Sequence, residues 1–298
     1  MDPKLQDLLK PEVLHTVDGL ELVARITVEG YMSGSNRSQA IGVGHEFSQY
    51  RNYEPGDDLR QLDWKMYARS ERYYIKQSDI ETNITVKFIL DASYSMAYEE
   101  NRLSKLQVAK VMTAALAYLA RKQRDTFGLY TVNDQKLGMV QPRFEQQQFI
   151  RFLNELIHLK SQGAWMTGSE MDTVINHQGK EMIIFITDLY DRDQDILEFI
   201  SALKTKRNEV IVFHLMGRSE YELDREGSYT FEELETGEKL KVNTAAQKES
   251  YTGLVKRWIE VSRAWMLEKQ INYHLVFMDE PIEQLLQHFL KSRKQLIR

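Results

Sequence analysis

The chain has 298 residues, of which 42% are hydrophobic, and its 39 basic against 44 acidic side chains give a formal net charge of −5. This mild acidity argues against a general nucleic-acid binder, because neutralising phosphates requires a basic face. The absence of cysteine excludes disulfides, thiol nucleophiles and thiolate metal sites. The first ten residues contain acids and bases without an apolar run, unlike a signal peptide. We therefore expect a cytoplasmic protein without a membrane span.

The first part of the chain, to about residue 82, shows no regular succession of strands and helices. It contains a short helical pattern at residues 5–9 and an amphipathic stretch at 20–28. From residue 83 onward, strand and helix patterns alternate, which is typical of a mainly parallel sheet with helices on both faces. The predicted strands span residues 84–90, 126–132, 182–187, 209–215 and 273–277. The predicted helices span residues 105–122, 145–158, 169–176, 193–206 and 245–269.

This alternation predicts an α/β fold with three layers and a doubly wound, mainly parallel, Rossmann-like sheet over residues 83–298. We expect residues 1–82 to form an accessory segment that packs on this domain. The helix over 106–120 is apolar nearly all round, as expected for a helix inside a three-layer fold. In the last long helix, apolar residues recur at alternating spacings of three and four, and we interpret them as core. They are Tyr251, Leu254, Trp258, Val261 and Trp265.

Residues 218–241 interrupt the alternation of strands and helices. This segment has the pattern of a hairpin that turns at Thr236 and Gly237, and it holds eight acidic against four basic side chains. We favour a solvated loop face over a docking surface for these acids, because runs of charge are usually solvated.

The most distinctive motif is the series Asp91, Ser93 and Ser95, which directly follows the strand over 84–90. Loops at the carboxyl ends of strands line the ligand crevice of a doubly wound sheet. One carboxylate and two hydroxyls form half of an all-oxygen shell, which suits Mg²⁺ or Mn²⁺ better than zinc. Asp188 follows the strand over 182–187 and could supply a further oxygen. A capping role for these side chains is weaker, because the next helical pattern starts about a dozen residues later.

The motif resembles the metal-ion-dependent adhesion site of von Willebrand factor type A domains. The resemblance implies metal ligands at Asp91, Ser93, Ser95 and Asp188, the last acting mainly through water. It also implies one hydroxyl ligand from a second loop, where the family's Gly-Gly-Thr pattern favours Ser169, with Thr167 as the alternative. Such a site implies a divalent cation, Mg²⁺ or Mn²⁺, and a role in protein–protein interaction.

A second block of motifs precedes the first strand. It resembles the bacterial DUF58 family, whose members carry an arginine, a Tyr-x-Pro-Gly-Asp-Asp-x-Arg string and an Asp-Trp pair before a von Willebrand type A domain. The resemblance implies partnership with a MoxR-type AAA+ ATPase. The residues that carry the motif are Arg51, Tyr53, Pro55, Gly56, Asp57, Asp58, Arg60, Asp63, Trp64 and Arg69.

The same block also has a structural interpretation. Pro55 and Gly56 are typical of a turn. Residues 37–81 contain seven basic and eight acidic side chains, so the block nearly neutralises itself. This balance favours internal ion pairs, between Asp57, Asp58 and Asp63 and Arg51, Arg60 and Arg69, over a nucleic-acid patch.

Taken together, these patterns predict a non-catalytic interaction module in which a protein partner's acidic side chain completes the coordination of the metal. No phosphate-binding loop or Gly-x-Ser-x-Gly elbow is present, and the seven histidines show no paired metal spacing. One alternative is a metal-dependent phosphohydrolase with Asp91 as nucleophile. That chemistry usually needs a second carboxylate where Ser93 stands, and a lysine that no pattern places. The other alternative is a scaffold with a vestigial site.

Overall fold

The computed structural model describes residues 9, 11–35, 49–53, 62–77, 84–134, 136–165, 172–175, 180–190, 195–223, 227–232, 234 and 237–297. The chain divides into two compact units by its contacts. One unit comprises Met1–Met32 together with Ile84–Arg298, and the other comprises Ser33–Asn83.

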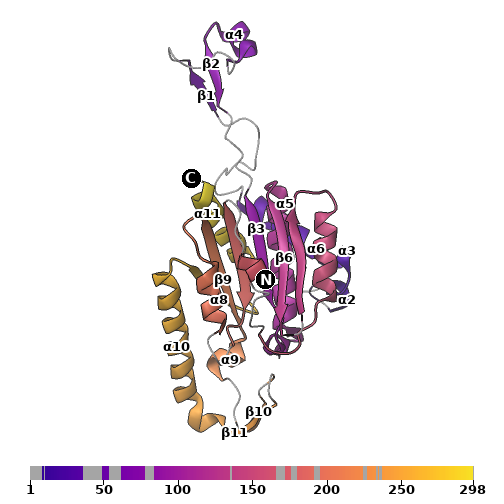
Figure 1. Ribbon diagram of the computed structural model, residues 1–298, viewed down its shortest axis with the longest axis vertical. Helices are drawn as coiled ribbons and strands as arrows, with labels where there is room; N and C mark the ends of the chain where they lie inside the picture. The colour runs from indigo at the N-terminus through magenta and orange to yellow at the C-terminus, as the bar shows by residue number, and fades with distance from the viewer. Residues whose placement is uncertain are drawn as a thin grey trace. The chain divides into compact units, whose positions relative to one another are not determined.

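The larger unit is built on a six-stranded sheet with the strand order β12-β9-β8-β3-β6-β7 (Figure 1). All neighbouring strands are parallel except β6 and β7, which pair antiparallel. The structure therefore confirms the predicted α/β class with a mainly parallel sheet. The strands are β3 (Thr85–Asp91), β6 (Thr126–Asn133), β7 (Lys136–Arg143), β8 (Glu181–Thr187), β9 (Asn208–Met216) and β12 (Asn272–Phe277).

Five of these six strands lie within one residue of their predicted bounds. The sixth, β7, was not predicted. It is an edge strand whose sequence holds Gly138 and Pro142, and its pairing with β6 shifts register between Phe127 and Leu129. Proline is tolerated at an edge because no second neighbour needs its missing N–H. These two residues weaken the strand pattern and explain why the sequence did not indicate it.

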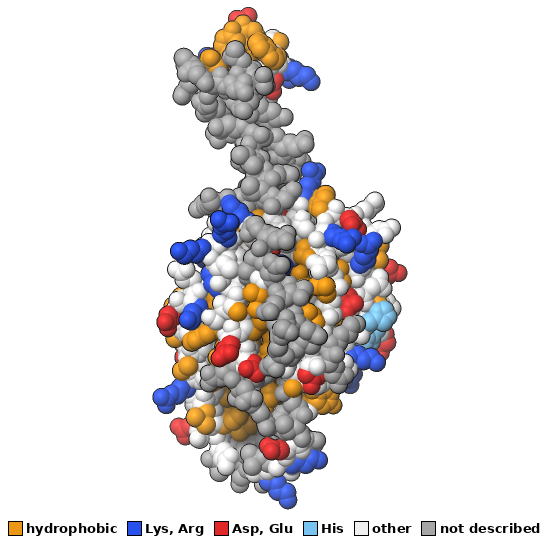
Figure 2. Space-filling view, viewed as in Figure 1, with side chains coloured by type: hydrophobic (Ala, Val, Ile, Leu, Met, Phe, Trp, Pro, Cys, Tyr) orange, Lys and Arg blue, Asp and Glu red, His pale blue; other side chains and the backbone are white. Residues whose placement is uncertain are grey.

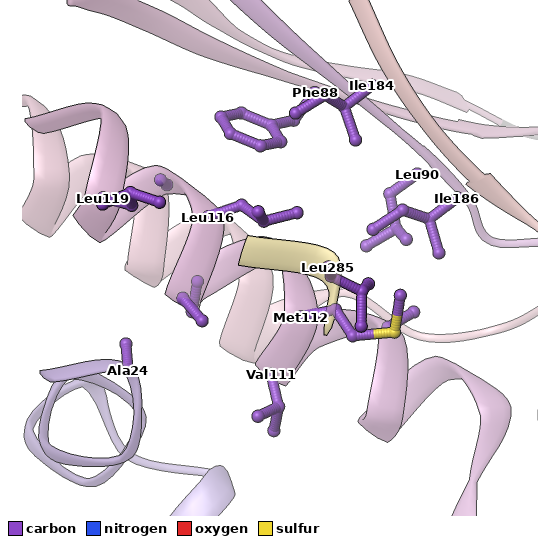
Figure 3. Close-up of a cluster of buried hydrophobic side chains, with 14 of the residues drawn as sticks. Ala24, Phe88, Leu90, Val111, Met112, Leu116, Leu119, Ile184, Ile186 and Leu285 are labelled. Carbon is purple, nitrogen blue, oxygen red and sulfur yellow. The ribbon is translucent and has the colours of Figure 1, made fainter. Parts of the chain in front are cut away.

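Helices cover both faces of the sheet and form two separate cores. On one face, side chains of β3 and β8 point onto α5 (Lys105–Lys122), and α11 (Glu283–Ile297) lies beside it. Figure 3 shows Phe88 and Ile186 facing Met112 and Leu116 of α5, with Leu285 of α11 beside them. The same face holds α6 (Gln148–His158), and the opposite core includes α8 (Asp195–Leu203). The all-round apolar character of α5 thus matches burial on all sides, as predicted.

The N-terminal helix α3 (Val17–Ser35), preceded by the short α2 (Pro11–Leu14), packs into the first core. Its buried apolar residues, Leu20, Val23, Ala24 and Val28, are spaced as on one helical face. The sequence pattern predicts one segment over residues 1–82, whereas the contacts assign residues 1–32 to the α/β unit. The helix predicted over 5–9 falls almost entirely outside the described residues.

The smaller unit contains the hairpin of β1 (Gln49–Asn52) and β2 (Tyr74–Gln77), with α4 (Trp64–Ser70) between the two strands. Asp63 was predicted as an ion-pair partner, and here its side chain caps α4 by accepting from the N–H groups of Lys65 and Met66. Tyr67 stacks on Tyr73 with ring centroids 4.5 Å apart.

The other motif residues of this unit are described only in part. Tyr53 donates its backbone N–H to the carbonyl of Tyr73 at 3.0 Å. Trp64 and Arg69 are exposed on α4, and Arg51 lies on β1. Pro55, Gly56, Asp57, Asp58 and Arg60 lie outside the described residues. The predicted ion-pair network and the packing of the segment on the α/β domain stay predictions.

The long helix α10 (Thr244–Glu268) contradicts the predicted core stripe. Leu254 is 65% exposed, Val261 60% and Trp258 39%. The helix buries a different face, with Ile259, Met266 and the small Ser262 turned inward. Tyr251 and Trp265 are partly buried, and Trp265 packs against the second core.

The position of α10 explains this exposure. The helix lies at one side of the sheet and extends toward the hairpin of β10 (Ser228–Glu232) and β11 (Lys239–Asn243) (Figure 1). It contacts β12, β11 and the short α9 (Arg218–Glu222), so only one of its faces is covered by these neighbours. The predicted hairpin is confirmed, although residues 218–222 before it are helical.

On the face that Figure 2 displays, basic and acidic side chains are interspersed with hydrophobic ones. No continuous basic surface is visible among the residues described there, in agreement with the near balance of charges in the sequence. Within the described ranges, no helix is both long and apolar enough to cross a bilayer.

Candidate metal site

The predicted ligands from two strands meet at the carboxyl edge of the sheet. Leu90 of β3 pairs with Ile186 of β8 in a parallel register. Asp91 and Asp188 follow these residues, and both are buried. Ser93 and Ser95 lie in the loop and the short 3-10 helix η2 (Tyr94–Ala97) that follow β3. The neighbouring strands therefore bring the two carboxylates to one site.

Both carboxylate oxygens of Asp91 are engaged within the chain. Oδ1 accepts the backbone N–H of Ser93 at 2.9 Å, and Oδ2 accepts the hydroxyl of Thr187 at 2.7 Å. The Thr187 hydroxyl in turn accepts the N–H of Leu189, a residue with a positive φ of 53°. Asp91 thus holds the two loops in place. Thr187 is a member of the site that no sequence motif indicates, although it directly precedes Asp188.

Ser93, Ser95 and Asp188 form a continuous chain of oxygen atoms. The Oγ atoms of the two serines are 3.0 Å apart, and the Ser95 hydroxyl donates to Asp188 Oδ1 at 3.1 Å. All three side chains are buried. Adjacent ligands of an octahedral Mg²⁺ shell, each about 2.1 Å from the metal, are about 3.0 Å from one another. The spacing of these oxygens therefore fits a hard divalent cation.

Capping does not account for this cluster. The helix α5 begins at Lys105 and is capped by Ser104, whose hydroxyl accepts the N–H of Gln107 while the Gln107 side chain accepts the N–H of Ser104. Ser93 occupies the N-cap position of η2, but its side chain makes no capping hydrogen bond. The polar side chains after β3 are therefore not needed to start α5.

A buried lysine that the sequence analysis did not identify completes the cluster. The Nζ atom of Lys105 donates to Asp188 Oδ2 at 2.9 Å and to Glu220 Oε1 at 2.7 Å. Burial alone would lower the pKa of Lys105, but the two carboxylates outweigh burial and raise it above its ordinary value. The ammonium therefore stays charged. The available signal was a charged residue at the start of an otherwise apolar helix.

Glu220 is an exception to the expected solvated face of residues 218–241, in which the described Glu222 and Glu238 are exposed. Its carboxylate is partly buried, and its Oε2 accepts the backbone N–H of Gly217 at 2.7 Å. Its backbone carbonyl accepts the hydroxyl of Tyr251 on α10 at 2.8 Å. Burial raises the pKa of Glu220, although Lys105 acts in the opposite direction.

The charges of this cluster do not balance. The ammonium of Lys105 contacts Asp188 and Glu220, and Asp91 adds a third carboxylate, so the formal charge is −2 when all four groups are ionised. Burial, and secondarily repulsion by Asp188, raise the pKa of Asp91 to about 7. A divalent cation would supply the charge that the cluster lacks, so both the donor set and the electrostatics fit Mg²⁺ or Mn²⁺.

The ligand predicted from the second loop is not placed, because Ser169 and Thr167 lie outside the described residues. Only Asp172–Ile175 of the predicted helix over 169–176 is described, as α7. No group of three or more histidine, aspartate or glutamate side chains in the described ranges could hold a metal. A metal at this edge would therefore need ligands besides such side chains, and the hydroxyl groups of Ser93 and Ser95 are of a suitable type.

His214 of β9 lies beside this cluster and belongs to the core. Its register partner in β8 is Thr187, and its Nδ1 lies 2.6 Å from the hydroxyl of Tyr273. Trp258 of α10 packs edge-on against its ring, with centroids 5.0 Å apart. Burial lowers the pKa of His214 to about 3, so the imidazole is neutral near pH 7.

Fold and site together define an α/β protein with an oxygen-lined cluster at the carboxyl edge of a mainly parallel sheet. The family model described as "Protein of unknown function DUF58" matches residues 49–257, which is more than half of the chain. The protein therefore belongs to the DUF58 family, as its motifs indicated.

Relatives of known sequence or structure are distant. An uncharacterized protein of Mycobacterium tuberculosis is 22% identical over 237 residues, covering 78% of this chain and 74% of the relative. The conserved hypothetical protein BatB of Bacteroides thetaiotaomicron matches 72% of this chain and 100% of its own, at 13% identity and a TM-score of 0.46. A von Willebrand factor type A structure from Catenulispora acidiphila matches 48% of this chain and 34% of its own, at 14% identity and a TM-score of 0.35. The fold assignment accordingly rests on the strand order given above.

Proposed function

We propose that this protein is a non-catalytic protein–protein interaction module that binds Mg²⁺ or Mn²⁺ at a site similar to the metal-ion-dependent adhesion site. Asp91, Ser93, Ser95 and Asp188 would hold the cation, together with one hydroxyl of residues 167–169. The observation that carries the proposal is the buried oxygen chain from Ser93 to Asp188, with spacings of 3.0 and 3.1 Å.

The surroundings of the site support a role in recognition. Tyr94 directly follows Ser93, and Tyr190 follows Asp188 and Leu189. Both tyrosine side chains are exposed. The Tyr190 N–H donates to Asp188 Oδ1 and so ties this tyrosine to the site. A bound cation would supply positive charge that an acidic side chain of a partner can coordinate. The two tyrosines would form part of the surface that such a partner meets.

The proposed partner is a MoxR-type AAA+ ATPase, with which the protein would act in complex assembly or chaperoning in the cytoplasm. Support for this partner comes from membership of the DUF58 family and from the partnership that the motif resemblance implies. A cation at the sheet edge gives this interaction a physical basis, because it allows the negatively charged cluster to bind a carboxylate of the partner.

The geometry gives less support to the phosphohydrolase alternative. A nucleophilic Asp91 would need access for a phosphoryl substrate, whereas its side chain is fully buried. Lys105 is a lysine of the kind that this chemistry needs, but its ammonium contacts Asp188 and Glu220. A metal titration distinguishes the proposed function from a scaffold with a vestigial site.

Capture of the MoxR-type ATPase of the same cell by the tagged full-length protein tests the proposal. We expect capture in Mg²⁺, loss of capture in EDTA, and loss in the Ser95→Ala variant. Ser292→Ala is the matched control, because Ser292 is equally buried but lies on α11. Capture that persists unchanged in EDTA would contradict the metal-bridged interaction. Mg²⁺ should also raise the melting temperature of wild type and of Ser292→Ala, since a ligand that binds only the folded state stabilises it.

A further inference from the structure

Lys105 occupies an unfavourable place for a lysine. It is the first residue of α5, where the partial positive charge of the helix end disfavours a cation. Its side chain is also removed from water, with the residue only 4% exposed. Burying an ammonium costs free energy unless charged partners compensate for the lost hydration. Specific contacts must therefore hold Lys105 in this position.

These contacts come from the candidate metal site and from α9. Asp188 presents Oδ2 to the ammonium at 2.9 Å and Glu220 presents Oε1 at 2.7 Å, while the ring of Tyr98 lies 5.1 Å from Nζ. The other oxygen of Asp188, Oδ1, is the one that accepts from Ser95. One carboxylate thus serves both the ammonium and the oxygen chain of the site.

We propose that Lys105 is an internal cation that competes with the divalent metal for Asp188 and so sets the affinity of the site. This inference rests on the metal site proposed above and adds its regulation. With Lys105 on Oδ2, part of the negative charge of Asp188 is already neutralised. A divalent cation that binds through Oδ1 must overcome the repulsion of an ammonium on the same carboxylate, and at this distance that repulsion is strong in a buried site.

Glu220 provides the position to which the ammonium can withdraw. Its carboxylate is fixed by the Gly217 N–H, and it already contacts Nζ. When a metal binds Asp188, Lys105 keeps a charged partner by moving toward Glu220. The hydroxyl of Tyr251 on α10 donates to the backbone carbonyl of Glu220. Metal binding at the sheet edge therefore changes the charge balance next to α9 and α10.

Calorimetric titration of Mg²⁺ and Mn²⁺ into the full-length protein tests this proposal. Lys105→Met removes the charge and keeps most of the volume, and we expect it to bind the cation about tenfold more tightly than wild type, or better. Lys87→Met is the matched control, because Lys87 is as buried and forms an ion pair of 3.1 Å with Glu181. Lys87 lies on the same strand as Asp91 but four residues away, so the cation affinity of Lys87→Met should equal that of wild type.

The outcomes separate the two proposals. If wild type binds the cation and Lys105→Met binds equally or more weakly, competition is wrong while the metal site stands. Binding by Lys105→Met alone would support the competition and show that the lysine blocks the site in wild type. If neither protein binds a cation, both proposals are overturned.

A second variant keeps the test decisive if Lys105→Met does not fold, which circular dichroism would reveal. Glu220→Gln retains the lysine but removes its alternative partner, so the ammonium binds Asp188 alone. We expect a cation affinity several-fold weaker than that of wild type. If Lys105→Met does not fold, an unchanged cation affinity in Glu220→Gln would overturn the proposed competition.

Discussion

The helices α5 and α10 are both long and rich in regularly spaced apolar residues, yet only α5 is buried on all sides. α5 lies on the sheet beside α6 and α11, with Ala24 of α3 on the side away from the sheet, and its residues Met112, Leu116 and Leu119 are buried (Figure 3). Among the described residues, α10 packs mainly on β12, β11 and α9, and Leu254 and Val261 stay exposed. A spacing pattern identifies the residues that share a face, but the number of layers around the helix decides whether that face is covered.

The largest expected effect is in α5. Leu116→Ala removes a fully buried side chain from the first core, and we expect it to lower the free energy of unfolding by about 2–5 kcal/mol. Equilibrium unfolding in urea measures this loss. A loss below about 1 kcal/mol would break the comparison, because it would mean that α5 is not tightly packed.

Trp258 should give an intermediate effect. Its side chain is less exposed than those of Leu254 and Val261, and its ring contacts His214. Its replacement by Ala removes this edge-on ring contact but leaves no closed cavity. We expect a loss of about 1–3 kcal/mol, between the losses of Leu116→Ala and Leu254→Ala. A loss as large as that of Leu116→Ala would indicate that α10 is buried after all.

The pH dependence of stability tests the contact between α10 and the sheet. His214 is held neutral by burial, with its pKa lowered to about 3 from an ordinary value of 6.5. Since the unfolded chain takes up a proton first, the stability from neutral His214 is present above pH 6.5 and is lost as the pH falls toward 3. Between pH 6 and 5 we expect wild type to lose about 1 kcal/mol more than His214→Phe, because the shifted pKa values of His274 and Asp91 act alike in both proteins. The exposed His158 on α6 offers the control His158→Phe, in which this loss should persist.

The smallest effect should come from the exposed stripe itself. Leu254→Ala and Val261→Ala remove side chains that are more than half exposed, so each should change the free energy of unfolding by less than about 0.5 kcal/mol. The same urea series measures both variants. Losses above about 2 kcal/mol would show that another part of the molecule covers this face.

Much of the fold could be predicted from local patterns. The strands β3, β6, β8 and β9 are mainly apolar and almost wholly buried, and α5 was placed at its observed bounds, because burial on both sides leaves a clear signal in the sequence. β7 lacks this signal because of Gly138 and Pro142. The exposure of Leu254 and Val261 could not be predicted, since it depends on which described elements pack around α10 and not on the pattern of the helix.

The candidate metal site, like the fold, could be predicted in large part from the sequence. Asp91, Ser93, Ser95 and Asp188 follow two strands, and the topology of a parallel sheet brings strand ends together. Lys105 and Glu220 escaped prediction because their contact joins residues 115 positions apart in the chain. Nothing in the local sequence of either residue specifies its partner.

The most direct test of the central claim is a crystal structure of the full-length protein grown in Mn²⁺, with anomalous diffraction data that locate the metal. We predict an anomalous peak about 2 Å from the Oγ atoms of Ser93 and Ser95, with the ammonium of Lys105 moved from Asp188 toward Glu220. No peak at this position in saturating Mn²⁺, with Lys105 still paired to Asp188, would contradict the proposed metal site.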